Sequence, residues 1–258
     1  AVAIVGSRRA DAYGRAAAEH FARALAAAGL TVVSGCAQGV DAVAHRAALA
    51  AGGTTVAVLG CGLGVDYPRG HARLRREIAA SGAVVSELPC AAEPLAWHFP
   101  VRNRLIAALA RGTLVVQAAE RSGSLITARH ALDLGRDVLA VPGSIFDRRS
   151  RGAHALLRDG AFPAADPRDV LDVLFGPSES DFLLAAGGGR AAVADAGRPE
   201  GLPGRVLAAL EVGRERRVEE VAAALGVPVD GVLGALLELE LAGWVRRHPG
   251  TAYSRAGR

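Results

Sequence analysis

Hydrophobic and polar residues recur in one order along residues 1–175. A short β-branched or aliphatic run is followed by a turn rich in Gly and Ser, and then by a helical stretch rich in Ala and Leu. The short runs predict strands at Val2–Val5, Thr31–Ser34, Thr55–Leu59, Ala83–Ser86, Thr113–Gln117 and Asp137–Val141. The stretches between them predict helices near Asp11–Ala28, Val40–Ala51, Gly70–Ser81, Arg102–Ala110 and Ser122–Leu134. Such alternation is typical of an α/β fold with a mostly parallel sheet and helices on both faces.

The pattern changes after Phe175. Glycine-rich strings at 176–178, 187–189 and 197–201 predict a flexible linker over residues 176–201. Regular structure resumes over residues 202–258, with helices expected at Pro203–Val212, Val218–Leu225 and Val232–Ala242, and extended segments at Trp244–His248 and Thr251–Ser254. Three helices and a two-stranded ribbon form the plan of a winged helix-turn-helix. We therefore predict a large domain over residues 1–175, the linker, and a small winged-helix domain over residues 202–258.

Composition adds several expectations. The 258 residues are 51% hydrophobic and only 4% aromatic, which indicates a core of small aliphatic side chains. No uninterrupted apolar run is long enough to span a membrane, and the first six residues are typical of a strand rather than a signal peptide. The absence of Met indicates that the sequence is a piece of a longer chain. The three Cys form no CxxC pair and the seven His show no metal-ligand spacing, so we expect a reduced, metal-free, cytoplasmic protein.

The charge balance gives a weak sign of a polyanionic partner. The formal net charge is +4 and the isoelectric point is about 9.5. The chain has no Lys, so all of this positive charge is Arg. Arg suits bidentate phosphate contacts, but a bias from Lys to Arg also arises from genome base composition, which we favour as its cause.

Candidate binding residues follow the ends of the predicted strands, where open parallel sheets bind their ligands. Gly6-Ser7-Arg8 follows the first strand, and a turn that contains Gly35 and Gly39 follows the second. The string 121–124, Arg-Ser-Gly-Ser, follows the fifth strand and opens a helix. Because helix N-termini present unpaired amides, this string predicts an anion site. A role of Ser122 or Ser124 as an ordinary helix cap is an equally good alternative.

The segment Trp97–Ile106 is the most informative. Arg102 and Arg104 flank Asn103 at an expected helix start, so at least one of the two should face the cleft. The ring of Phe99 is suited either to stack on a nucleic-acid base or to pack in the core, and the sequence leaves both open. We interpret Trp97 as a core or interface residue.

Some motifs are absent. Without Lys there is no phosphate-binding P-loop, so ordinary P-loop ATP hydrolysis is excluded. The first turn is not G-x-G-x-x-G, and the second strand ends in Ser34-Gly35 rather than in an acid that would hold a ribose, so no nicotinamide cofactor is expected. Glu87 has no evident acid–base partner. We predict no catalytic residue, no metal and no cofactor, and we expect a protein that is not an enzyme.

Several strings resemble the DprA/Smf family of DNA-processing proteins, in that family's order and over roughly residues 1–165. The F-P-x-R-N-R string at 99–104 and the S-G-S-L-I-T-A string at 122–128 are specific in combination. The segment 236–245 is similar to the family's C-terminal winged-helix module. Four positions depart from the family pattern: Gln117 replaces Glu, His71 and His154 replace Asn, and Cys36 replaces Leu.

The resemblance implies an extended Rossmann-like fold that binds single-stranded DNA without sequence preference. It also implies homodimers that load the RecA recombinase onto that DNA during natural transformation of competent cells. Read from the residues, binding is electrostatic: Arg side chains neutralise phosphates and turn amides fix their positions. The predicted DNA-binding residues are Gly6, Ser7, Arg8, Gly35, Gly39, Phe99, Arg102, Asn103, Arg104, Arg121, Ser122, Gly123, Ser124 and Arg129.

Two alternatives come from other function classes. Related Rossmann-like phosphoribohydrolases process nucleotides with a P-G-G-x-G-T loop and a catalytic Glu, whereas the string 121–124 here is followed by no acid in the next turn. A winged-helix transcription regulator is the other alternative. Its expected recognition helix, Asp230–Ala242, carries three acids and no Arg, which does not suit a DNA groove. We interpret this module as a protein-contact or accessory domain.

Overall fold

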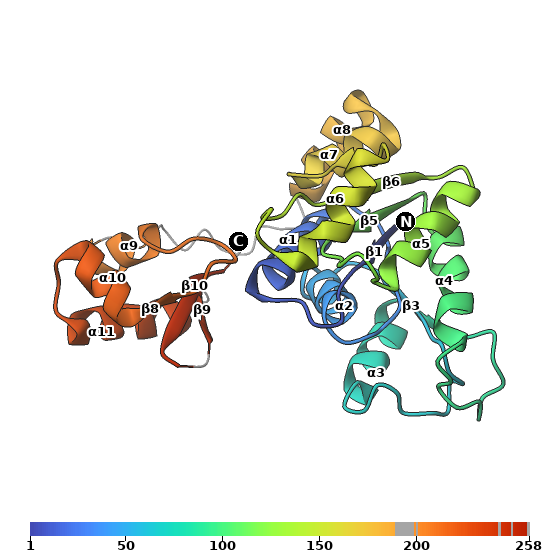
Figure 1. The fold of residues 1–258 in the computed structure, drawn as a ribbon, viewed down its shortest axis with the longest axis horizontal. Coiled ribbons are helices and arrows are strands. Elements are labelled where there is room, and N and C mark those ends of the chain that lie inside the picture. The colour runs from blue at the N-terminus through green and yellow to red at the C-terminus, as the bar shows by residue number, and fades with distance from the viewer. Residues whose placement is uncertain (189–198, 200, 242–243, 249, 257–258) are drawn as a thin grey trace. The chain divides into compact units, whose positions relative to one another are not determined.

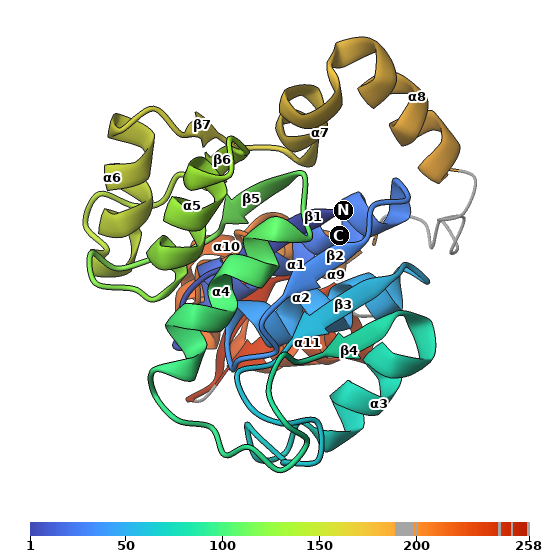
Figure 2. The same ribbon diagram turned by 90° about the vertical axis from the view of Figure 1, so that its right-hand side faces the viewer.

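The structure, a computed structural model, describes residues 1–188, 199, 201–241, 244–248 and 250–256 (Figures 1 and 2). The chain divides into two compact units. One contains Ala1–Ala10 and the described residues from Ala18 to Gly188, and the other contains Asp11–Ala17 and the described residues from 199 onward. Each unit is described by itself.

A seven-stranded sheet with the order β4-β3-β2-β1-β5-β6-β7 forms the first unit. Its strands are β1 (Val2–Val5), β2 (Val32–Ser34), β3 (Thr55–Val58), β4 (Ala83–Val85), β5 (Gly112–Val115), β6 (Asp137–Ala140) and β7 (Phe162–Pro163). All neighbouring strands are parallel. The strand order reverses between β1 and β5, where Val5 pairs with Val115. This reversal is the switch point at which open α/β sheets form their binding clefts.

Helices lie on both faces of the sheet (Figure 2). Small aliphatic side chains of α2 (Val40–Ala50) and α3 (Ala72–Ser81) pack on one face, and those of α4 (His98–Ala108) and α5 (Ser124–Asp133) pack on the other. The remaining helices of residues 1–188 are α1 (Ala12–Ala27), a short 3₁₀ helix (Arg148–Ser150), α6 (Arg151–Arg158), α7 (Pro167–Phe175) and α8 (Pro177–Gly188). The predicted fold class is thereby confirmed.

The six predicted strands form with ends shifted by two residues at most, but α4 begins earlier than predicted. It starts at His98 and not near Arg102. Pro100 is tolerated because the first turn of a helix leaves its amides unpaired in any case. Arg102 and Arg104 therefore lie in the second turn of α4 and not at its start.

The linker prediction for residues 176–201 is wrong for Pro177–Gly188, which form α8. Pro177 suits a first helical position and Glu179 suits the first turn of a helix. Asp181 accepts a hydrogen bond from Arg168 of α7 at 2.5 Å. The glycine-rich composition hid these helix signals. Residues 189–198 and 200 of the predicted linker lie outside the described residues.

The second unit confirms the predicted winged helix, with one correction. Its elements are α9 (Gly201–Ala208), β8 (Arg216–Arg217), α10 (Val218–Leu225), α11 (Val229–Leu241), β9 (Val245–His248) and β10 (Ala252–Arg255). The predicted two-stranded ribbon is a three-stranded antiparallel sheet with the order β8-β10-β9. Two residues are enough to form β8, which is too short to leave an alternating pattern in the sequence.

Among the described residues, no single helix has the length and apolarity to cross a membrane. One bent pair, Val218–Leu225 with Val229–Glu240, passes that test only when its two helices, 113° apart, are taken together.

Candidate nucleic-acid interface

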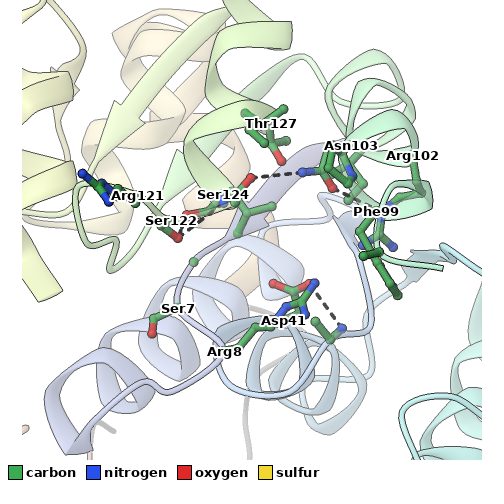
Figure 3. A pocket seen from close by; sticks show the side chains of 18 of the residues that line it. Ser7, Arg8, Asp41, Phe99, Arg102, Asn103, Arg121, Ser122, Ser124 and Thr127 are labelled. Carbon is green, nitrogen blue, oxygen red and sulfur yellow. Dashed lines mark hydrogen bonds between the residues drawn. The ribbon is translucent and has the colours of Figure 1, made fainter. Parts of the chain in front are cut away.

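A cleft of about 660 Å³ opens at the carboxyl ends of β1 and β5 (Figure 3). Three chain segments supply most of its polar lining: the turn after β1, the start of α4 and the turn that enters α5. Ten of the predicted site residues lie in the lining: Gly6, Ser7, Arg8, Phe99, Arg102, Asn103, Arg121, Ser122, Gly123 and Ser124.

The turn after β1 is held by close packing against the start of α2. Gly39 has a φ of +80°, and a Cβ atom on it would lie 2.2 Å from the Ser7 carbonyl oxygen. The Val40 amide donates to that oxygen at 3.1 Å. Gly39 does not line the cleft itself, but it allows the close approach that fixes Ser7 and Arg8 at the cleft floor.

The turn that enters α5 is held from α4. Asn103 donates from Nδ2 to the Gly123 carbonyl oxygen at 3.1 Å, and the hydroxyls of Ser122 and Ser124 lie 2.8 Å apart. Gly123 stands at the N-cap position of α5 and has no side chain to cap it, but Ser122 Oγ accepts from the Ser124 amide, the first of α5, at 3.4 Å. The cap alternative therefore holds for Ser122, and no described hydrogen bond supports it for the Ser124 side chain. The Gly123 amide makes no hydrogen bond within the described part of the chain. This helix start therefore presents an unpaired donor beside the cleft.

Arg102 is buried, with 6% of its surface exposed. Its Nη1 donates to the Gly35 carbonyl oxygen at 2.8 Å and also to the Val58 carbonyl oxygen, so it joins the ends of β2 and β3. Gly35 separates the guanidinium from Asp41, and a Cβ atom on Gly35 would lie 2.7 Å from each of them. Arg102 is thus a positioning residue that presents only one edge to the cleft.

Asp41 carries the negative charge that balances Arg102. Its Oδ2 accepts from the amides of Gly35 and Ala37 at 3.2 and 3.3 Å. Burial raises the pKa of Asp41, and the Arg102 guanidinium and these amides oppose that rise. Burial likewise lowers the pKa of Arg102, opposed by Asp41. The two side chains offset each other, so neither sets the net charge of the cleft.

Phe99 packs partly into the structure and partly lines the cleft, so its stacking on a base stays a prediction. The ring is partly buried over Gly60, where a Cβ atom would meet it at 2.7 Å, and it also lines the cleft. The Arg8 guanidinium lies 5.1 Å from its centroid and the Tyr67 ring 5.5 Å away. Trp97, in contrast, is 62% exposed and contacts the His98 ring, so it is not a core residue, and its alternative place at an interface stays a prediction. Trp97 is the residue immediately before α4, so it lies at the helix end and not between the helix and the sheet.

Four predicted site residues do not line the cleft, namely Gly39, described above, and Gly35, Arg104 and Arg129. Arg104 forms an ion pair with Glu87, with its Nη2 2.7 and 2.6 Å from the two carboxylate oxygens. Arg129 is exposed on α5 outside the cleft. Gly35 lines a neighbouring cavity of about 300 Å³ that shares Arg8 and Phe99 with the cleft.

The sequence reasoning missed Arg9 and Thr127, which both line the cleft. The Arg8-Arg9 pair after the first strand was a visible signal for Arg9. Arg8, Arg9 and Arg121 form no ion pair within the described residues, while Arg102 and Asp41 balance each other. The cleft lining therefore carries an excess of positive charge.

The four departures from the family pattern lie behind this lining. Gln117 is buried, with Nε2 3.5 Å from Asp147 Oδ2. His71 Nδ1 lies 3.1 Å from the Cys36 carbonyl oxygen, and His154 Nε2 lies 3.0 Å from the Gly143 carbonyl oxygen. Cys36, with a φ of +56°, lines only the smaller cavity. These residues support turns and do not replace any Arg of the cleft.

Comparison with known proteins gives a consistent result. The family model described as DNA recombination-mediator protein A matches residues 1–175, and the model described as DprA winged helix domain matches residues 190–251. Protein Smf of Escherichia coli is 41% identical over 265 residues, which cover 96% of this chain and 66% of the relative. DNA processing protein DprA of Bacillus subtilis is 40% identical over 67% of this chain and 58% of its own length. The chain thus spans about three fifths of these curated relatives.

Two solved structures resemble the sheet unit. DNA processing protein A from Streptococcus pneumoniae has 45% sequence identity and a TM-score of 0.63 over 67% of this chain and 61% of that one. DNA processing protein A from Helicobacter pylori has 32% identity and a TM-score of 0.61, over 67% of this chain and 79% of that one. The report of the latter structure describes a single-stranded DNA binding mode.

Proposed function

The chain belongs to the DprA family of DNA-processing proteins, and we propose that it binds single-stranded DNA without sequence preference in the cleft at the ends of β1 and β5. One observation carries the proposal: Arg8, Arg9 and Arg121, which form no ion pair among the described residues, line the same cleft. The relative from Helicobacter pylori binds this class of ligand.

The proposed contacts divide between phosphates and bases. The three Arg side chains neutralise phosphates, and the turn amides of Arg8 and Gly123 position them, while the Ser7 amide donates to the Gln117 carbonyl oxygen at 2.7 Å and is already engaged. Phe99 offers its ring to one base, with Arg8 already beside it at 5.1 Å. Phosphates carry no base identity and an aromatic ring stacks on any base, so this set of contacts binds DNA of any sequence.

Arg102 and Asn103 position the segments that make these contacts and are not themselves assigned a phosphate or a base. Arg102 holds the ends of β2 and β3, and Asn103 holds the turn that enters α5. Arg104 and Arg129, which lie outside the cleft, take no part in this revised set.

We further propose the finer activities that the family resemblance implies. The bound strand is handed to a RecA recombinase during natural transformation, and the chain works in the cytoplasm as a homodimer. Residues 1–175 carry the DNA contacts, and residues 202–258 serve as an accessory module. The family match and the order in which its strings occur along the chain support these proposals.

A non-catalytic role fits the chemistry of the cleft. Asp41 is the single carboxylate among the described lining residues. Two backbone amides donate to it, and the Arg102 guanidinium lies beside it. General acid–base hydrolysis needs a carboxylate that exchanges a proton with substrate or water. We therefore propose a binding protein rather than a phosphoribohydrolase. Incubation with nucleoside monophosphates should release no free base.

The direct test is a fluorescence anisotropy titration of the chain with labelled single strands and with duplexes of matched length, at two salt concentrations. We expect preference for single strands, similar affinity for unrelated sequences, and weaker binding at higher salt. Equal affinity for the two forms, or affinity that does not respond to salt, would overturn the proposal.

A further inference from the structure

An apolar stripe lies exposed along α11 of the winged-helix unit, the helix labelled in Figure 1. Val229, Leu233 and Leu237 are 42%, 43% and 57% exposed. They follow one another at intervals of four residues, so they lie on one side of the helix. We call these three residues the α11 stripe.

The α11 stripe takes no part in the core of its own unit. A neighbouring side of the helix supplies Val232, Ala235, Leu236 and Leu239 to that core, each at most 5% exposed. α11 is therefore apolar on two sides, although packing within the unit uses only one. Exposed apolar side chains that form a continuous row typically mark a contact surface, unlike ones that are scattered singly.

Exposed acidic residues accompany the stripe on α11 and on the neighbouring helix α10. Asp230 and Glu238 are exposed beside it, and Glu219 and Glu220 are exposed on α10. From Val218 to Leu241 the sequence contains five acids and no Lys or Arg. The basic residues of this unit lie on other elements: Arg216, Arg217, Arg246, Arg247 and Arg255 on its three strands, Arg205 on α9, Arg214 before β8 and Arg15 on α1. The helix that a winged-helix protein commonly places in a DNA groove is here apolar and acidic.

This charge distribution indicates which kind of ligand the α11 stripe can bind. DNA phosphates are repelled by Asp230, Glu238 and the α10 acids. A second copy of the chain is disfavoured too: antiparallel stripes bring Asp230 opposite Glu238 of the other copy, and parallel stripes bring like residues together. A helix with apolar side chains on one face and Lys or Arg beside them complements the stripe and its acids. Gly234 lies next to the stripe, and a Cβ atom on it would meet no neighbouring atom within 4 Å, so a partner backbone can approach closely there.

We propose that the α11 stripe is the docking site for a basic amphipathic helix of another protein. The stripe buries apolar side chains of the partner, while Asp230 and Glu238 pair with its cations and orient it. The winged-helix unit is then a protein-binding module, and its docking site does not depend on DNA binding by the cleft.

The test uses the full chain and a defined probe, a fluorescein-labelled helical peptide of about 18 residues with Leu on one face and Lys on the other. We expect this peptide to bind, and a matched peptide with Glu for Lys to bind at least about tenfold more weakly, which is about 1.4 kcal/mol. Leu233→Gln and Leu237→Gln should each weaken binding of the Lys peptide several-fold. Leu109→Gln, at an equally exposed Leu (49%) of the sheet unit, should not.

Charge reversal provides a second and independent measurement. Asp230→Lys combined with Glu238→Lys should shift the preference from the Lys peptide to the Glu peptide, and circular dichroism should show that every variant keeps its fold. The proposal is overturned if the Lys peptide does not bind, if the α11 variants bind it as the parent does, or if they lose affinity for duplex DNA instead. Titration with single-stranded DNA in parallel separates the two proposals, since these variants should keep the parent affinity for it.

Discussion

Arg102 donates a hydrogen bond from Nη1 to the carbonyl oxygen of Gly35 at 2.8 Å, across a sequence separation of 67 residues. The contact ties the second turn of α4 to the end of β2. Arg104, two residues further along the same helix, points elsewhere and pairs with Glu87 at the surface. Two Arg residues of one short string thus have different roles, because residues two apart on a helix face nearly opposite directions.

The first prediction concerns the stability that each of these residues contributes. Arg102→Ala should lower the free energy of unfolding by about 3–5 kcal/mol, because it leaves the Asp41 carboxylate buried without its neighbouring cation. Arg104→Ala, which removes a half-exposed ion pair, should cost less than about 1 kcal/mol. Urea unfolding of both variants measures the difference. Similar losses for the two would mean that Arg102 is not the positioning residue described above.

The second prediction concerns phosphate contacts. Arg8→Ala and Arg121→Ala should each weaken single-strand binding for unrelated sequences alike, and each should reduce the slope of log affinity against log salt by about 0.7. Their stability should change by roughly 0.5 kcal/mol or less, since neither residue is paired within the described chain. Arg129→Ala, an exposed Arg outside the cleft, is the matched control and should change neither quantity. Unchanged slopes for Arg8→Ala and Arg121→Ala would place the DNA somewhere else.

The third prediction concerns the close approach at Gly39. Gly39→Ala should displace the Ser7 carbonyl, because the new Cβ would start only 2.2 Å from it. We expect a loss of about 2 kcal/mol or more in stability, together with weaker DNA binding. Gly52→Ala is the control: its φ is +69° but its Cβ position is open, so it should cost about 1 kcal/mol of backbone strain and leave binding unchanged. Normal DNA affinity in folded Gly39→Ala would show that the turn tolerates displacement.

The fourth prediction concerns acid stability and His45. This ring is fully buried, and its Nδ1 lies 2.7 Å from Thr55 Oγ1, whose hydroxyl donates to the Val32 carbonyl. Nδ1 therefore carries the proton and donates to Thr55. Burial, followed by the charges of His71 and Arg102, lowers the pKa of His45 from 6.5 to about 3.

The sign of the pH effect follows from that shift. Above pH 6.5 the ring is neutral in both states. As the pH falls from 6.5 towards 3, the unfolded chain takes up a proton that the folded chain does not, so stability decreases by on the order of 1 kcal/mol per pH unit. His45→Gln should flatten this dependence between about pH 6.5 and 5 in urea unfolding, and His130→Gln should leave it steep. An equal slope for His45→Gln and the parent would refute the assignment.

The sequence was sufficient for the elements whose patterns are local. Strand β1 and helix α10 were both predicted with their observed bounds. A short apolar run marks β1, apolar residues at helical spacing mark α10, and both patterns are visible without tertiary information. Helix α8 was missed because its glycines and its Gly-Pro start are also typical of a linker, whereas the ion pair between Arg168 and Asp181 appears only in three dimensions.

The cleft was predictable in position but not in detail. Gly-rich turns at the ends of parallel strands indicated its place. The choice between Arg102 and Arg104 depended on the start of α4 at His98, which Pro100 in the first turn obscured. The exposure of Trp97 depended on the same helix start, and the role of Gly39 depended on the packing of α2 against the turn after β1.

The central place of β1 has a consequence for synthesis on the ribosome. β1 is translated before the other strands of its sheet, yet it pairs with β5 through Val5 and Val115, which are 110 residues apart. At a translation rate of roughly 5–20 residues per second, one edge of β1 waits for several seconds before its partner emerges. During that time only β2, β3 and β4 can assemble beside it, and an apolar strand edge stays open. The nascent chain should therefore depend on chaperones until β5 has been made, and slowed translation between β4 and β5 should increase its aggregation.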